Sequence, residues 1–213
     1  MRKILLSLVI LSGILGARAN AGGFFNATEI WGSMSFGSLL SGFQLDMPRQ
    51  TLAPAPDNCS AIMPMVGIRS YLVGPIGLEA SAGFGMTTAN FSGGYSAIRM
   101  YDFTMVNLGL VGRYAFRLPG SRAGCAILAG AGADYSFLSL ADAYTSLFSG
   151  FSFYKVLSDV GWYARTGISW YPTPGFFLEA DACYYYVNAR FDVSGKQLDG
   201  AYLLAAVSLG FAF

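Results

Sequence analysis

Two acidic residues, Glu179 and Asp181, are the pair in this sequence best placed for acid–base chemistry. Residues two apart in an extended strand point to the same face, so their carboxylates would lie side by side. The usual partner for such a pair is an imidazole base, which titrates near neutral pH. The chain contains no His. We therefore expect no enzymatic activity and no catalytic residue, and we interpret both carboxylates as members of an ion-pair network.

Three Cys residues, Cys59, Cys125 and Cys183, are the other candidates for chemistry. A metal site needs clustered ligands, and these residues are widely spaced. Cys125 and Cys183 fall on segments that we do not expect to be neighbours, which places them beyond disulfide reach. We expect no metal and no cofactor.

The first 21 residues have the layout of a secretory signal peptide. Arg2 and Lys3 precede an apolar run, and the small-residue exit Ala-Asn-Ala ends at Ala21. A retained anchor is the alternative, but the run is shorter than the ~18 residues that a spanning helix needs. We predict a signal peptide over 1–21 and one domain over 22–213.

Composition excludes several classes of protein. Of the 13 basic residues three lie in the leader, so the mature chain has a slight excess of acidic residues and no basic surface for nucleic acid. The mean hydropathy of +0.48 is typical of membrane proteins. After the leader, however, no apolar run approaches ~18 residues. A lipid environment without spanning helices requires a closed β-barrel, which pairs every backbone group internally.

Eight segments can be read as strands, which predicts an all-β, eight-stranded, antiparallel, transmembrane up-and-down barrel. Short connections rich in Pro and Gly, such as VGPIG and YPTPG, alternate with longer ones, as in outer-membrane barrels with tight periplasmic turns and longer outer loops. The predicted strands are Asn26–Leu40, Ile62–Val73, Gly77–Phe91, Arg99–Phe116, Ala123–Phe137, Tyr154–Tyr171, Gly175–Phe191 and Leu198–Phe213.

Each strand alternates an apolar face with a face of small or charged residues, as expected for lipid outside and lumen inside. Trp162 and Trp170 lie eight residues apart on one apolar face, about 26 Å along a strand, and Phe176 and Tyr184 repeat this spacing. These four residues are the predicted aromatic girdles. A soluble barrel is the structural alternative, but it needs a polar outer surface, and too few charged residues are available to coat one.

The inward-facing charged residues are predicted to form an ion-pair network in the periplasmic half of the lumen, because an unpaired buried charge is costly. Pairing Trp170 with Phe176 places Arg165 opposite Asp181, and a similar count places Glu79 diagonal to Arg113. The network could be a plug or an ion path, and we favour the plug because side chains fill a barrel of this size. Its predicted members are Arg69, Glu79, Arg113, Arg165, Glu179 and Asp181, with Asp134 and Glu29 as further candidates.

The A-x-A leader, the eight amphipathic strands, the Pro/Gly turns and the closing strand LLAAVSLGFAF together resemble the small outer-membrane β-barrel families of the OmpA/OmpX class. The resemblance implies an integral protein of the bacterial outer membrane, in contact with its lipid, without a periplasmic peptidoglycan-binding domain. It also implies that the alternating C-terminal residues Leu209, Phe211 and Phe213 are the signal that the barrel-assembly machinery reads.

The outer connections are predicted to carry any binding specificity. The segment from Leu138 to Phe153 is unusually apolar, and such a surface either binds a ligand or folds over the barrel mouth. Its candidate binding residues are Leu140, Tyr144, Leu147, Phe148, Phe151 and Phe153. We expect a monomer with a structural or surface-interaction role through these loops, and the alternative is a narrow channel for ions or small hydrophobic molecules.

Overall fold

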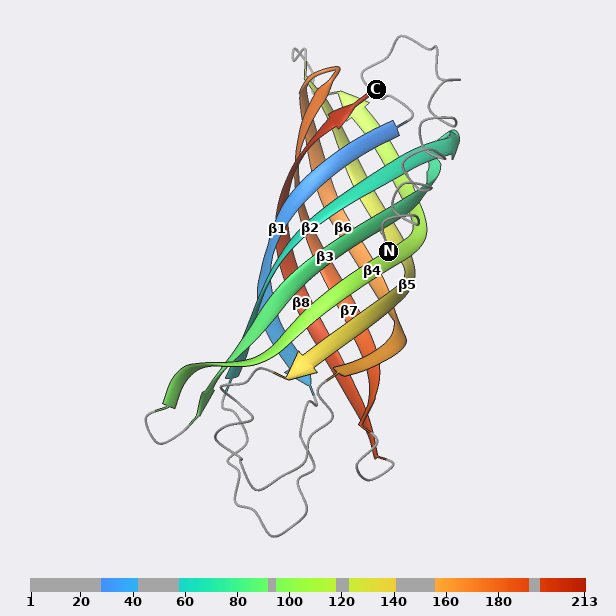
Figure 1. Ribbon diagram of the computed structural model, residues 1–213. Coiled ribbons are helices and arrows are strands. Elements are labelled where there is room, and N and C mark those ends of the chain that lie inside the picture. The colour runs from blue at the N-terminus through green and yellow to red at the C-terminus, as the bar shows by residue number, and fades with distance from the viewer. Residues whose placement is uncertain (1–27, 42–57, 92–94, 118–122, 141–155, 192–195) are drawn as a thin grey trace.

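The computed structural model describes residues 28–41, 58–91, 95–117, 123–140, 156–191 and 196–213 (Figure 1). In this part of the chain eight antiparallel strands follow one another around a closed barrel, and β8 pairs with β1. The structure confirms the predicted eight-stranded up-and-down barrel. The strands are β1 (Thr28–Ser41), β2 (Asn58–Val73), β3 (Ile76–Phe91), β4 (Tyr95–Arg117), β5 (Gly124–Leu140), β6 (Val156–Thr173), β7 (Phe176–Phe191) and β8 (Lys196–Ala212).

The predicted strand boundaries differ from these by a few residues. The largest differences are at β2, which begins at Asn58 rather than Ile62, and at β4, which begins at Tyr95 rather than Arg99. The predicted signal peptide lies outside the described residues. Within those residues, no helix is long and apolar enough to cross a membrane.

Tight turns gather at one end of the barrel, which we call the turn end. The β2–β3 hairpin turns at Gly74 and Pro75, where Gly74 has a φ of 56° that favours glycine. The β6–β7 hairpin turns at Pro174 and Gly175. The C-terminus lies at this end (Figure 1), and Phe213 donates its N–H to the Thr28 carbonyl at 2.9 Å. The β1–β8 ladder therefore closes the sheet at the turn end.

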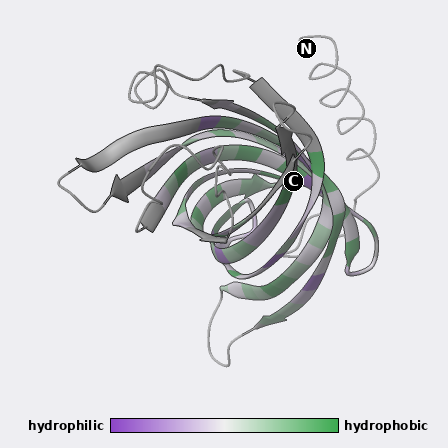
Figure 2. Ribbon diagram, turned by 90° about the horizontal axis from the view of Figure 1, so that it is seen from below, coloured by the Kyte–Doolittle hydropathy of each residue, from purple (hydrophilic) through white to green (hydrophobic). Residues whose placement is uncertain are grey.

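Alternation divides every strand into an outer and an inner row. Along β8, Leu203, Val207 and Leu209 are exposed while Leu204 and Ser208 are buried. Seen along the barrel, green and paler bands alternate along the strands (Figure 2). The outer row is a belt of exposed apolar side chains, among them Val66, Phe84, Leu108, Leu110, Ile168 and Val207. A water-soluble protein would bury such a belt, whereas lipid solvates it.

The predicted register between β6 and β7 is wrong by two residues. Trp170 pairs with Leu178 rather than Phe176, and Arg165 pairs with Cys183 rather than Asp181. The chain reverses in a two-residue turn, and a register shift lies between Trp170 and the turn. Side chains alternate between the two faces of a strand with a period of two residues. A register error of two residues therefore leaves each side chain on its predicted face.

The predicted register between β3 and β4 also needs correction. Glu79 pairs with Gly109, and Arg113 lies beyond the last paired residue of β3, where its N–H donates to the Pro75 carbonyl at 2.8 Å. Arg113 is therefore not the diagonal neighbour of Glu79. Glu79 instead forms its short ion pair with Arg165 of β6, on another side of the lumen, and a 3.8 Å pair with Arg69 of β2.

Candidate functional site: the ion-pair network of the lumen

Arg69 of β2 is fully buried in the turn-end half of the lumen and contacts three carboxylates, those of Glu29, Glu79 and Glu179. Its Nη1 and Nη2 donate to the two oxygens of Glu179 at 3.1 and 2.5 Å, a bidentate geometry. Its Nε donates to Glu29 of β1. Its Nη1 also lies 3.8 Å from Glu79 of β3, so that one guanidinium joins β1, β2, β3 and β7.

Arg165 of β6 is the second centre of the network. Its Nη1 donates to both oxygens of Glu79 at 2.8 and 2.9 Å. Its Nη2 donates to Glu179 at 2.5 Å and to Asp181 at 2.8 Å. Arg165 therefore contacts Asp181 although the two residues are not paired in register, because a long side chain reaches a diagonal neighbour.

Glu29 links a third guanidinium to the network. Arg113 Nη1 donates to Glu29 Oε1 at 2.8 Å, and the Tyr171 hydroxyl donates to the same oxygen at 2.6 Å. The Ser169 hydroxyl donates to Glu179 at 2.5 Å. Hydroxyl groups thus satisfy carboxylate lone pairs that the Arg residues leave open.

An aromatic ring lies under each of these Arg residues. The guanidinium carbon of Arg113 is 3.7 Å from the centroid of Tyr71. Arg69 lies 5.0 Å from the centroid of Phe177, and Arg165 lies 5.1 Å from that of Trp31. Stacking on a ring and bonding to a carboxylate fix both the plane and the direction of each guanidinium.

The structure places all six predicted network members on the inner face and brings them into one connected cluster with Glu29. Asp134, the eighth candidate, is buried elsewhere and accepts a bond from Ser136 at 2.5 Å. The cluster contains four carboxylates and three guanidinium groups, each at most 9% exposed. A formal charge of −1 therefore lies inside the turn-end half of the lumen.

The other half of the lumen is filled mainly by apolar and aromatic side chains, with buried Thr87 and Ser136 among them. Toward the end opposite the turns, the inner rows of β2, β4, β7 and β8 carry buried side chains. Among them, the rings of Phe103 and Tyr202 pack against each other with centroids 5.8 Å apart. The largest of these residues are Met63, Phe103, Met105, Val187, Tyr202 and Leu204. Ionic and apolar layers thus follow each other along the barrel axis.

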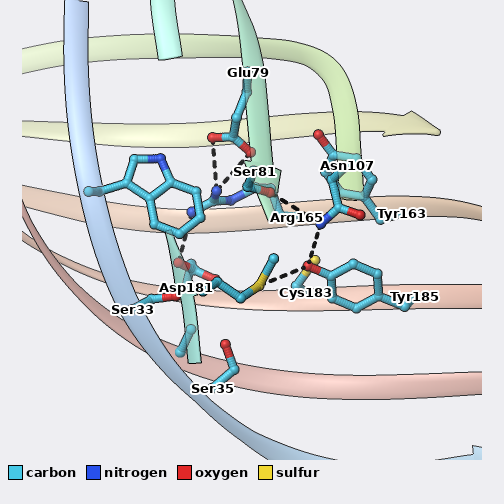
Figure 3. A pocket seen from close by; sticks show the side chains of 13 residues that line it. Ser33, Ser35, Glu79, Ser81, Asn107, Tyr163, Arg165, Asp181, Cys183 and Tyr185 are labelled. Carbon is cyan, nitrogen blue, oxygen red and sulfur yellow. Dashed lines mark hydrogen bonds and ion pairs between the residues drawn. The ribbon is translucent and has the colours of Figure 1, made fainter. Parts of the chain in front are cut away.

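A small cavity separates these layers (Figure 3). About 10 Å³ of it is open to the centre of a water molecule, which corresponds to roughly one water. Glu79, Arg165 and Asp181 lie on one side of it, and Asn107, Tyr163 and Tyr185 lie on another (Figure 3). Asn107 Nδ2 donates to Ser81 at 3.2 Å and to Tyr185 at 3.3 Å.

The predicted girdle residues lie on the outer face in two groups. Trp162 packs against Tyr184 with ring centroids 5.2 Å apart and the rings tilted by 35°, while Phe176 lies 5.9 Å from Phe211 near the turn end. Trp170 is 45% exposed. Leu209, Phe211 and Phe213, the predicted assembly signal, are each more than half exposed on the same face. Of the predicted binding loop, 144–153 lies outside the described residues, and the side chain of Leu140 is not described.

Sequence reasoning missed the residues that complete the lumen. Tyr163 and Tyr171 share the inner face of β6 with Arg165, so strand alternation could have identified them as network neighbours. Trp31 lies two positions from Glu29 and could have been found in the same way, whereas Asn107 has no charged neighbour two positions away. Only the closure of the barrel brings Asn107 to the network.

Two solved structures share this architecture. The outer membrane protein OprG from Pseudomonas aeruginosa superposes with a TM-score of 0.56 over 88% of this chain and 96% of that chain, at 13% identity. Neisserial surface protein A superposes with a TM-score of 0.52 over 87% of this chain and 97% of that chain, at 12% identity. No protein-family model matches the sequence, and no curated protein matches it.

These likenesses are to the fold. The closed eight-stranded barrel and its apolar outer belt define the class of protein: a small integral β-barrel of the bacterial outer membrane. Within this class, the chain has the architecture that OprG and Neisserial surface protein A share, with a lumen filled by its own ion-pair network.

Proposed function

We propose that the protein is a monomeric, non-conducting membrane scaffold that acts through the outer connections of its barrel. The observation that carries this proposal is the filling of the lumen. Arg69 and Glu29 are 0% exposed, and Glu79 and Glu179 are at most 3% exposed. Side chains rather than water occupy the barrel at this level, as expected for eight strands.

The apolar layer supports the same proposal. An ion entering from the end opposite the turns meets Phe103, Met105 and Leu204, none more than 2% exposed, before it reaches any charged group of the network. Desolvating an ion among such side chains is costly. The two layers oppose ion passage for different reasons, the first mainly by its closely packed apolar side chains and the second by tightly pairing its charged groups.

The absence of enzymatic activity is part of this proposal. Glu179 and Asp181, the only carboxylate pair with the spacing for acid–base work, both accept hydrogen bonds from Arg165. A general base needs a lone pair directed at substrate. The mid-lumen cavity has room for about one water, which is too small for an organic substrate.

The outer surface suggests how the scaffold is held and assembled. We propose that the apolar belt contacts outer-membrane lipid between girdles formed by Trp162 and Tyr184 at one level and Trp170 and Phe176 at the other. Leu209, Phe211 and Phe213 are exposed in the closed barrel and would be equally available to the assembly machinery. The connections 42–57 and 141–155 remain as the segments that could meet a surface ligand, including the apolar residues from Tyr144 to Phe153.

Planar-bilayer recording of the refolded full chain tests the scaffold against the channel alternative. The expected result is no reproducible discrete conductance. The matched variant Phe103→Ala opens the apolar layer without touching an ion pair, and it should also fail to conduct because the network remains. Discrete conductance of the unaltered protein that Arg165→Ala changes would contradict the proposal and favour an ion path through the lumen.

A further inference from the structure

The mid-lumen cavity lies beside a network that has one more negative than positive charge. Four carboxylates share three guanidinium groups; six of these residues are buried, and the side chain of Asp181 is 5% exposed. An uncompensated charge in such surroundings is costly, and proteins remove it by pairing, by protonation or by binding an ion. The structure therefore poses the question of what neutralises the excess.

The excess negative charge is located mainly at Asp181, a carboxylate that faces the cavity. Glu179 receives bonds from both Arg69 and Arg165. Asp181 has only Arg165, which it contacts through Oδ2, and this same guanidinium also serves Glu79 and Glu179. Asp181 is thus the carboxylate with the smallest share of positive charge, and it lines the cavity.

Two further oxygens line the cavity without a hydrogen-bond partner among the described residues: the hydroxyl of Tyr163 and Oδ1 of Asn107. Both side chains are at least 98% buried. The ring of Tyr163 is fixed by stacking on Tyr185 at 5.9 Å, and its hydroxyl occupies space that Gly109 leaves open. Among the described residues, eight side chains hold a buried polar atom without a partner, and Trp31 Nε1 is a third such atom at this cavity. A bound water or ion is one explanation of such atoms.

We propose that this cavity binds one monovalent alkali cation of the size of Na⁺, beside Asp181, Asn107 and Tyr163. Carboxylate, carbonyl and hydroxyl oxygens are the ligands that hard cations take. A water would give the two partnerless oxygens a hydrogen-bond partner but would not neutralise the excess charge. A proton would neutralise the charge but would leave the two oxygens without a partner. A single cation would neutralise the charge and also be coordinated by both oxygens.

The charge of the ion follows from the same observations. The network has a single excess negative charge, which a monovalent ion balances. A divalent ion would need several acidic or imidazole ligands together, and among the described residues no three His, Cys, Asp or Glu side chains are grouped for this purpose. The space, roughly that of one water, admits an alkali ion and excludes an organic cation such as choline.

Unfolding of the refolded full chain by urea in detergent tests the site. Titrations are run in NaCl and in choline chloride at matched ionic strength. A ligand that binds only the folded state multiplies the folding equilibrium constant by one plus the ratio of its concentration to its dissociation constant. Above that constant, each tenfold increase in Na⁺ should raise the folding equilibrium constant about tenfold relative to choline.

Three variants locate the effect. Asp181→Asn removes the excess charge and should abolish the difference between the two salts. Tyr163→Phe removes one oxygen and keeps the stacked ring, so it should require a higher Na⁺ concentration for the same stabilisation. Tyr71→Phe is the matched control, because its buried hydroxyl also lacks a hydrogen-bond partner but does not line the cavity.

The proposal is overturned if Na⁺ and choline stabilise the protein equally, or if the Na⁺ response of Asp181→Asn equals that of the unaltered chain. If Asp181→Asn does not fold, the comparison of the Na⁺ responses of Tyr163→Phe and Tyr71→Phe tests the site instead. Equal Na⁺ responses in these two variants would also reject the site.

Discussion

Replacement of Arg165 by Ala is the most direct test of the lumen network. The change removes the guanidinium that bonds to Glu79 at 2.8 and 2.9 Å and to Asp181 at 2.8 Å. Glu179 keeps Arg69 at 2.5 Å. Glu79 keeps only a 3.8 Å contact to the same Arg69, so two buried carboxylates lose their main cation.

The expected cost follows from this count. Removing one partner of a buried ion pair costs about 3–5 kcal/mol, because it leaves a buried charge uncompensated. With two carboxylates affected, we expect Arg165→Ala to fall at the upper end of that range. Arg113→Ala is the internal comparison: Glu29 retains its bond from Arg69, so the loss should be smaller.

The assay is reversible urea unfolding in detergent, followed by tryptophan fluorescence. The triple variant Arg165→Met, Glu79→Gln, Asp181→Asn removes one positive and two negative charges and should recover most of the stability, since apolar or neutral replacements of a buried ion cluster are often tolerated. A loss below about 1 kcal/mol in Arg165→Ala, the range of a solvent-exposed pair, would refute the reasoning.

Three further predictions concern packing, lipid contact and assembly. Gly67→Ala would place a Cβ 2.4 Å from the ring of Trp31, and the resulting overpacking should lower stability by about 1–3 kcal/mol in the same urea assay. Leu108→Arg, 60% exposed near the middle of β4, should cost about 2–4 kcal/mol for refolding into vesicles, because the charge faces hydrocarbon. Deleting Phe213 should lower the yield of heat-modifiable barrel in the outer membrane on unboiled gels, with little change in unfolding of whatever protein assembles.

Each of these has a matched control. Gly32→Ala meets its nearest atom at 3.9 Å and should be neutral, so equal losses at Gly32 and Gly67 would argue against the ring contact. Leu72→Arg, beside the β2–β3 turn, should cost only about 0–1 kcal/mol, and a cost equal to that at Leu108 would contradict the position of the belt. Phe36→Ala is as exposed as Phe213 but lies away from the C-terminus, and an equal loss of assembly would remove the special role of Phe213.

The fold could be predicted from the sequence because alternation is a local property. Leu203, Val207 and Leu209 occupy one face whatever the neighbouring strand does, and their pattern distinguishes lipid from lumen. For the same reason, the residues predicted to face the lumen were assigned to the correct face even where the register was wrong. Arg165 and Asp181 stayed on the inner face although their pairing was wrong by two residues.

The partners within the network could not be predicted so well. Register depends on where a turn reverses, and the five-residue motif YPTPG contains only a two-residue turn. Cross-strand pairing predicts contacts only between adjacent strands. Glu79 of β3, however, contacts Arg165 of β6 across the lumen. That contact depends on the narrow bore of a closed barrel, a property of the whole sheet rather than of any segment.

The network also determines the stage of folding at which water leaves the lumen. Its ion pairs connect β1, β2, β3, β4, β6 and β7, and the hydrogen bond from Tyr171 to Glu29 spans 142 positions of the chain. The β1–β2 hairpin can already pair Glu29 with Arg69, and the β6–β7 hairpin can pair Arg165 with Asp181. The contacts that cross the lumen, such as Arg165 to Glu79 and Arg69 to Glu179, need the closed barrel. Until β8 meets β1, the charged row therefore remains hydrated along one side of an open sheet. Water therefore leaves the interior at the final step of folding, and the barrier to closure should include the work of stripping seven ionised groups at once.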